Sequence, residues 1–300
     1  MGVVLYHLKG NFAFQHPGQN LGWVGRLWGE GAFGVPLFFA ISGFIIARPF
    51  LRHKSVSIKR YMLRRLSRLE PPYFINLIFV FALKVWILGI AASQLWPHLV
   101  ASMAYSHNIW YGGESLVNGV AWSLEVEWQF YVTAPLIFAL TIRPRPRWFV
   151  IWMLVVLGGL MHSLSPMYST EVVLSLLHYF GFFIGGVWAA AVIENGSLNL
   201  HPIVYDLIWI GTSLAMLLIL TGSIHFGDLP GAGQPYSYML LPMLSGFTVL
   251  GAMNGKVAQA VLGWWPIYII GGMCYTVYLY HFFVISAMSH VVGLAPNWFG

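Results

Sequence analysis

Charged residues are scarce in this chain. Lysine, arginine, aspartate and glutamate make up 8% of its 300 residues, whereas a soluble globular domain carries about 25%. Hydrophobic residues account for 58% of the chain, and the mean hydropathy is +0.72. So few polar side chains could not form a surface that keeps the protein dissolved. The composition therefore excludes a soluble globular domain and indicates a protein that lies in a lipid bilayer.

Cysteine is almost absent as well. Cys274 is the single cysteine, so an intrachain disulfide is impossible and a cysteine-rich metal site is excluded. The motifs H-E-x-x-H, G-x-S-x-G, Walker A and G-x-G-x-x-G are missing. Their absence excludes zincin proteases, serine hydrolases with a nucleophile elbow, P-loop motors and dinucleotide-dependent enzymes. We expect no metal.

Long apolar runs fill most of the chain. A membrane-spanning helix needs about 17 to 25 mostly apolar residues, and windows of that length predict an all-α, polytopic transmembrane helix bundle formed by residues 1–300 as one domain. The initial MGVVLYHL resembles the end of a partial first helix. We expect eight further helices, at 33–50, 71–92, 118–140, 148–165, 171–193, 203–222, 237–253 and 265–289.

Basic residues are concentrated in two segments. Eight of the fifteen lysines and arginines lie between Arg48 and Arg68, and three more lie in RPRPR at 143–147. Basic loops face the cytoplasm, which predicts that loops 48–70 and 141–147 are cytoplasmic in a multi-pass protein of the cell inner membrane. The net charge of +6 is then mostly a topology signal. Nothing folds outside the membrane to read nucleic acid, so nucleic acid is not an expected partner.

Three arginines of the longer basic segment are closely spaced. In YMLRRLSRLEPPY we expect a short helix that carries Arg64, Arg65 and Arg68 and ends at Pro71 and Pro72. Arg65 and Arg68, three residues apart, project from the same side of such a helix. Guanidinium groups in this arrangement suit the phosphates of a bound ligand. The alternative is ordinary cytoplasmic charge with contacts to anionic lipid.

Five short motifs follow one another along the chain. They are VVLYH (3–7), GVPLFFAISGFII (34–46), YMLRRLSRLEPPYF (61–74), AWSLEVEWQFYV (121–132) and CYTVYLYHFFV (274–284). Each is similar to a motif of the integral-membrane acyltransferase-3 family, and all five occur in the family's order. The resemblance makes His7 the candidate catalytic histidine, puts Glu127 in the position of the motif glutamate, and makes His281 the histidine of a late helix.

The resemblance implies a membrane-bound O-acyltransferase of the cell envelope. Such an enzyme moves an acyl group, most often acetyl, from cytoplasmic acyl-CoA to a hydroxyl of a carbohydrate or lipid-linked glycan. Acyl-CoA is then a substrate, and no permanently bound cofactor is expected. The cytoplasmic cluster of Arg64, Arg65 and Arg68 would hold the phosphates of acyl-CoA. The transferred acyl group and the acceptor stay open.

This chain departs from the family pattern at several positions. Pro36 stands where aspartate is frequent, and Trp128 replaces a frequent second glutamate. The arginine that the family places eleven residues before the first-helix histidine would precede Met1. The family usually has ten helices. We therefore expect that the start of the first helix and the last helix are missing here.

Glu125 and Glu127 are two carboxylates within an apolar stretch. Residues two apart in an α-helix point about 200° away from each other, so they are not a paired acid and base. A carboxylate at the centre of a bilayer costs roughly 2.5 to 3.5 kcal/mol. We expect Glu125 to be exposed to water near the end of its helix. Glu127 lies deeper and is expected to be functional, the alternative being a structural partner of an arginine, a histidine or the backbone.

His7 is the residue expected to carry the chemistry. With an unperturbed pKa near 6.5, a neutral imidazole accepts the proton of an acceptor hydroxyl, and a carboxylate such as Glu127 would hold the ring. The alternative is a histidine at the membrane interface. His281 is expected to be a hydrogen-bonded residue of the bundle. The Ser-Gly-Phe sequence at 42–44 is expected to allow close helix packing, with no catalytic role for its serine.

Two other functions stay open. A transporter for a glycan or a lipid-linked sugar would also carry glutamate and histidine within the membrane, although the two halves of this chain show no internal repeat. An inactive, truncated paralogue would account for the missing ends.

Overall fold

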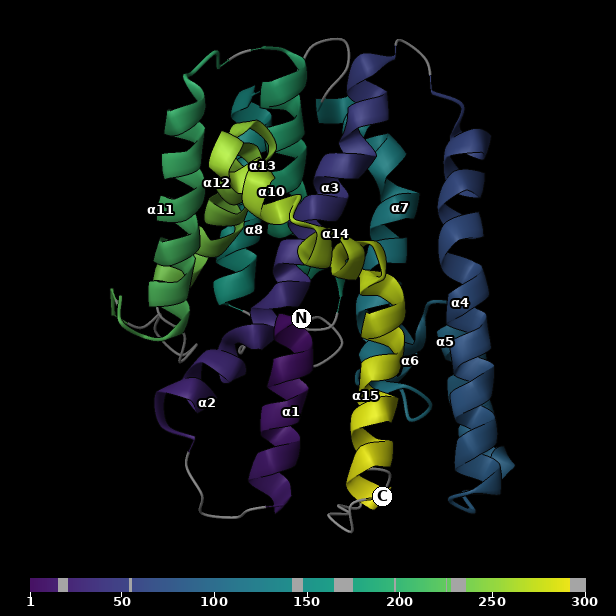
Figure 1. Ribbon diagram of the computed structural model, residues 1–300. Helices are drawn as coiled ribbons and strands as arrows, with labels where there is room; N and C mark the ends of the chain where they lie inside the picture. Colours follow the sequence, from purple (N-terminus) through teal and green to yellow (C-terminus); the bar gives the residue numbers. More distant parts are fainter. Residues whose placement is uncertain are drawn as a thin grey trace. The chain divides into compact units, whose positions relative to one another are not determined.

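The computed structural model describes residues 1–15, 21–53, 56–141, 148–164, 175–196, 198–224, 226–227 and 236–291. All regular secondary structure in these residues is helical (Figure 1), which confirms the predicted all-α bundle. Each of the eight expected segments contains a helix. These helices are α3 (Gly34–Arg52), α4 (Ile58–Trp86), α7 (Trp122–Thr141), α8 (Trp148–Ser163), α10 (Leu176–Glu194), α11 (Pro202–Leu220), α12 (Leu241–Asn254) and the pair α14 (Trp265–Gly272) and α15 (Cys274–Val291).

Within the residues that the structure describes, several helices qualify as membrane spans by length and apolar composition. Five do so, and a sixth is added if α14 and α15, bent by 77°, form one broken span. The α8 helix has only 16 residues. The α7 helix has 20 residues, but its glutamates and Gln129 lower its hydropathy. These spans support the polytopic helix bundle that the sequence predicts.

The α4 helix also corrects the sequence prediction. It continues through Pro71 and Pro72 to Trp86, as the uninterrupted ribbon in Figure 1 shows. A proline removes one N–H donor and frees the carbonyl four residues before it, here those of Ser67 and Arg68. Both of these residues are exposed, and membrane helices tolerate such freed carbonyls where other donors reach them. The prolines therefore do not end the helix.

The chain divides into two compact units. Unit 1 comprises Met1–Val35, Leu66–Glu125 and Ile270–Gly300, and unit 2 comprises Pro36–Arg65 and Val126–Ile269. Four helices, α3, α4, α7 and α14, contribute residues to both units. The expectation of one domain stays a prediction.

Small residues set the packing of unit 2. A side chain on Gly43 of α3 would collide with the backbone carbonyl of Phe183 in α10, and one on Gly186 of α10 would collide with that of Ala40. Phe183 stacks on Phe39 with ring centroids 4.7 Å apart. This confirms the close helix packing predicted for residues 42–44, because glycine is needed where backbones approach this closely. In Figure 1, α8 and α12 also lie beside α10.

Buried amides connect the elements of unit 1. Asn76 of α4 donates to the carbonyl of Leu279 in α15 at 3.3 Å and accepts from Asn118 at 2.5 Å. Asn118 in turn caps the 3-10 helix η2 (Gly119–Ala121) by accepting from the N–H of Val120. The other helices of this unit are α1 (Gly2–Gln15), α2 (Gly22–Gly29), η1 (Glu30–Phe33), α5 (Ala92–Met103) and α6 (His107–Tyr111). In unit 2, η4 (Tyr236–Leu240) precedes α12 and α13 (Lys256–Leu262) follows it.

Candidate functional site

His7 lies beside a second histidine in unit 1. Its ring centroid, on α1, is 5.0 Å from that of His281 on α15. Phe282 meets the His7 ring edge to face at 5.3 Å. The His7 side chain is half-buried. The candidate catalytic imidazole is therefore set among rings of the late helix that carries the fifth motif.

A hydrogen bond fixes the tautomer of His281. Its Nδ1 lies 2.7 Å from the carbonyl oxygen of Tyr278, and because a carbonyl only accepts, Nδ1 carries the proton. In the neutral ring Nε2 is then an acceptor. Nε2 is buried and has no hydrogen-bond partner among the described residues. The prediction of a hydrogen-bonded bundle residue is confirmed, and its second nitrogen remains available.

The turn of α15 that carries His281 is held to the start of α7. The hydroxyl of Tyr278 donates to the carbonyl of Val120 at 3.1 Å, and Ser123 donates to that hydroxyl at 2.7 Å. Since the carbonyl of Tyr278 orients His281, this network fixes both the ring and the helix turn on which it lies.

Glu127 is buried in unit 2 and accepts from two hydroxyl groups. Its side chain is 2% exposed, and its Oε1 accepts from Ser42 at 2.6 Å and from Tyr131 at 2.5 Å. Tyr61 donates to the carbonyl of Tyr131 at 3.2 Å. The expectation that Ser42 only allows close packing missed this contact. The sequence gives no sign of it, because Ser42 and Glu127 are 85 residues apart.

Glu125 is not exposed to water as predicted. It is 1% exposed, and its Oε2 accepts from the backbone N–H of Asn108 at 2.8 Å. The prediction was wrong because the backbone of α6 supplies an N–H donor to this carboxylate. A carboxylate that accepts such a hydrogen bond can be buried. The two glutamates use different donors, as expected of residues on different faces of α7.

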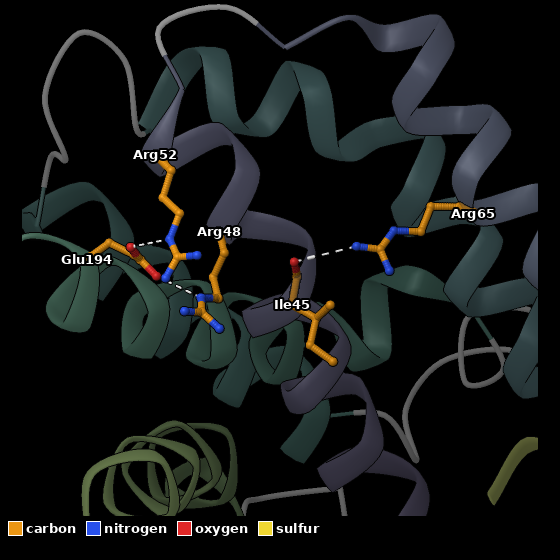
Figure 2. Close-up of polar contacts among 5 residues, drawn as sticks. All are labelled: Ile45, Arg48, Arg52, Arg65 and Glu194. Atoms are coloured by element: carbon orange, nitrogen blue, oxygen red, sulfur yellow. Dashed lines mark hydrogen bonds and ion pairs between the residues drawn. The ribbon is translucent and has the colours of Figure 1, made fainter. Parts of the chain in front are cut away.

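The three predicted arginines of α4 differ in their surroundings. The guanidinium of Arg65 lies 5.8 Å from the ring centroid of Tyr131, and its Nη2 donates to the carbonyl of Ile45 at 3.5 Å, a contact drawn in Figure 2. Arg64 and Arg68 are exposed. Arg65 and Glu127 thus contact the same tyrosine, which links one predicted phosphate-binding residue to the buried carboxylate.

Two expectations stay predictions. His7 belongs to unit 1 and Glu127 to unit 2, so the expected contact between imidazole and carboxylate is not tested. The basic sequence at 143–147 lies outside the described residues.

Comparison with known proteins identifies the family. The family model described as "Acyltransferase domain" matches residues 1–300. A provisionally named O-acetyltransferase of Staphylococcus aureus strain COL is 25% identical over 327 residues, which cover 99% of this chain and 51% of the relative. The O-acetyltransferase OatA of Staphylococcus aureus strain NCTC 8325 is 23% identical over 325 residues, with the same coverage.

The chain thus spans about half the length of these curated relatives. No solved structure matches it. The family match covers all five motifs noted in the sequence, and together they show that this multi-pass membrane protein belongs to the acyltransferase-3 family.

Proposed function

We propose that this protein is a membrane O-acyltransferase that moves an acyl group, in the first place acetyl, from cytoplasmic acyl-CoA to a hydroxyl of a carbohydrate or lipid-linked glycan. Family membership over residues 1–300 is the observation that carries the proposal. The names of the two relatives, both O-acetyltransferases, favour acetyl as the group and oxygen as the acceptor atom. The positive-inside rule favours a cytoplasmic position for loops 48–70 and 141–147, on the side where acyl-CoA is found.

His7 is the proposed general base. Its neutral imidazole takes the proton of the acceptor hydroxyl while that oxygen attacks the thioester carbonyl. The new C–O bond forms, the C–S bond breaks, and the departing thiolate of CoA takes the proton back from the imidazolium. The neighbouring His281 supports this role, since its ring is fixed by the carbonyl of Tyr278 and lies 5.0 Å from that of His7. Fixed neighbours limit the positions of a catalytic ring.

Glu127 is the proposed catalytic carboxylate. A carboxylate held in one position by the hydroxyls of Ser42 and Tyr131 can stabilise a positive charge that forms beside it without reorganising. Arg64, Arg65 and Arg68 are the proposed ligands of the acyl-CoA phosphates, and the exposure of Arg64 and Arg68 supports access by a soluble donor.

Replacing His7 tests the chemistry. Purified protein in lipid nanodiscs is given acetyl-CoA and an acceptor glycan, and release of the CoA thiol is followed together with the mass of the glycan. The single exposed cysteine, Cys274, adds only a constant background to the thiol signal. His7→Ala is expected to abolish transfer without affecting membrane insertion. His201→Asn is the matched control, because His201 is exposed and caps α11 through its ring, which asparagine also does. Transfer by His7→Ala would remove His7 from the mechanism.

Replacing two arginines tests donor binding. Arg65→Ala combined with Arg68→Ala is expected to raise the KM for acetyl-CoA at least about tenfold, since a hydrogen bond to a charged group contributes roughly 1.5 to 3 kcal/mol. Lys59→Ala with Arg60→Ala removes the same charge from exposed positions of the same helix and serves as the control. An unchanged KM would return Arg65 and Arg68 to the role of topology signals.

A further inference from the structure

Two arginines near the end of α3 share one carboxylate of α10. Arg48 Nε lies 2.7 Å from Oε1 of Glu194, and Arg52 Nε lies 2.6 Å from Oε2 of the same residue. Figure 2 shows the carboxylate beside the two guanidinium groups, with one oxygen directed to each. All three residues belong to unit 2. The cluster carries two positive charges and one negative charge, which leaves a net charge of +1.

Most of the donor capacity of these arginines is unused. Each guanidinium has five N–H donors, and the contact with Glu194 takes only the one on Nε. The terminal nitrogens of Arg48 and Arg52 make no hydrogen bond within the described part of the chain. The side chains of Arg48 and Arg52 are 32% and 51% exposed, whereas Glu194 is 12% exposed. The carboxylate is therefore the less exposed support of two accessible donor groups.

A purely structural role does not account for this arrangement. A single arginine would neutralise Glu194, and two like charges four residues apart on a helix repel each other. Cations near a helix C-terminus are stabilised by the free carbonyls, but both guanidinium groups are turned to Glu194. Arg48 also lies over the Phe44 ring, 5.4 Å from its centroid, which further restricts its orientation. The second arginine thus adds terminal N–H donors that make no hydrogen bond within the described residues.

We propose that Arg48 and Arg52, oriented by Glu194, bind a phosphate group. Guanidinium donors match phosphate oxygens in pairs, and side chains already fixed through Nε lose little further freedom when a ligand binds. Arg65, whose Nη2 reaches the carbonyl of Ile45 one turn before Arg48 on α3, adds positive charge to the same segment, as Figure 2 shows.

Two sources of this phosphate share the same chemistry. One is the phosphates of acyl-CoA, and this alternative rests on the proposed function. The other is the head group of an anionic lipid, which does not depend on any catalysis. Arg48 and Arg52 themselves are not among the arginines of α4 that the sequence motif indicated.

The first experiment measures binding of both phosphate ligands to purified protein. Coenzyme A is titrated by calorimetry, with pantetheine, which lacks the phosphates, as the matched probe. Phosphatidic acid is titrated by native mass spectrometry, with a neutral diacylglycerol as its probe. Arg48→Gln with Arg52→Gln is expected to weaken binding of one phosphate ligand at least about tenfold and to leave the phosphate-free probes unchanged. Unchanged binding of both ligands would overturn the proposal.

A charge-matched control separates an oriented site from diffuse attraction. Lys59→Gln with Arg60→Gln removes two exposed positive charges of α4, and it is expected to change affinity less than about twofold, because exposed charges are screened by salt. An equal loss of affinity in this control would overturn the proposal in favour of general electrostatic attraction.

Glu194→Gln gives the sharpest distinction. The substitution raises the net charge of the cluster by one, so general attraction predicts tighter binding of phosphate. An oriented site predicts weaker binding, by roughly threefold or more, because the two guanidinium groups lose their common support. Tighter or unchanged binding would overturn the proposal. Arg52→Lys keeps the positive charge but lacks the forked guanidinium group, so it tests the site if the double glutamine variant does not fold. Equal phosphate affinity of Arg52→Lys and the unmodified protein would then overturn the proposal.

Turnover separates this proposal from the proposed function. Transfer of acetyl at saturating acetyl-CoA does not depend on donor affinity. If the Arg48 and Arg52 variant still transfers acetyl and still binds phosphate as the unmodified protein does, the site is disproved and the proposed function is intact. Specific phosphate binding by a protein that never transfers an acyl group would disprove the function and leave the site intact.

Discussion

Glu125 and Glu127 lie two residues apart on α7, and both are almost inaccessible, yet their donors are of different kinds. Glu125 accepts from a backbone N–H of α6, whereas Glu127 accepts from the side-chain hydroxyls of Ser42 and Tyr131. A backbone donor is fixed by the helix to which it belongs. Side-chain hydroxyls orient the carboxylate in the way that the proposed reaction requires. We therefore predict that Glu125 holds the fold and that Glu127 takes part in the reaction.

Among the variants that test this comparison, Glu127→Gln is expected to have the largest effect on acetyl transfer. Transfer should fall roughly a hundredfold, within the range that loss of an acid–base or charged partner produces. Stability should change little, because the glutamine carbonyl still accepts from both Ser42 and Tyr131. Acetyl transfer and the thermal unfolding midpoint, measured on the same preparation, check both statements. Full transfer activity in this variant would assign Glu127 to structure.

Glu125→Leu should have the opposite profile. It removes the carboxylate that accepts from the buried N–H of Asn108, and the loss of such an acceptor costs about 1 to 3 kcal/mol. Transfer per folded molecule should stay within about twofold. Glu125→Gln retains an acceptor oxygen and should regain most of that stability. If folded Glu125→Leu protein had lost transfer and Glu127→Gln protein had kept it, the two roles would have to be exchanged.

Asp206 extends the comparison to a carboxylate with backbone donors in unit 2. From α11 it accepts from the N–H groups of Val257 at 3.1 Å and Ala258 at 2.9 Å, both in the first turn of α13. This is the contact of an N-cap, supplied from a distant helix. Asp206→Ala is expected to lower stability by roughly 0.5 to 2 kcal/mol and to leave transfer unchanged. The stability of Asp206→Ser, which keeps one acceptor, should lie between that of the unmodified protein and that of Asp206→Ala. A loss of transfer in either variant would contradict a structural role for Asp206.

The helices could be predicted from the sequence because the thickness of the bilayer fixes their length and their apolar composition. The family motifs likewise indicated His7, Glu127 and the arginines of α4. The errors have a common cause. The donor of Glu125, the hydroxyl that reaches Glu127 and the support of Arg48 all come from distant parts of the chain, and no periodicity in the sequence reveals such partners. The continuation of α4 through Pro71 and Pro72 could not be predicted either, because propensity alone favours an end there.

The smallest expected effect concerns acid and a pair of histidines near the backbone donor of Glu125. His107, at the start of α6, accepts at Nε2 from Nδ1 of His98 at 2.8 Å, while its own Nδ1 donates to the carbonyl of Gly113 at 3.2 Å. Burial, and next the neighbouring His98, lower the pKa of His107 to about 4, and burial also lowers the pKa of His98.

An unfolded histidine binds a proton near pH 6.5, so between about pH 6.5 and pH 4 the unfolded state holds more protons than the folded state. The histidine pair therefore contributes a loss of stability as the pH falls through this window. We expect the unfolding midpoint of the unmodified protein to fall relative to that of His107→Gln by a few degrees between about pH 7 and pH 5. Because His107 is not one of the residues proposed to act in the reaction, His107→Gln should retain transfer at neutral pH. If the stability of His107→Gln were as sensitive to acid as that of the unmodified protein, the pKa values of His98 and His107 would not be lowered as their burial requires.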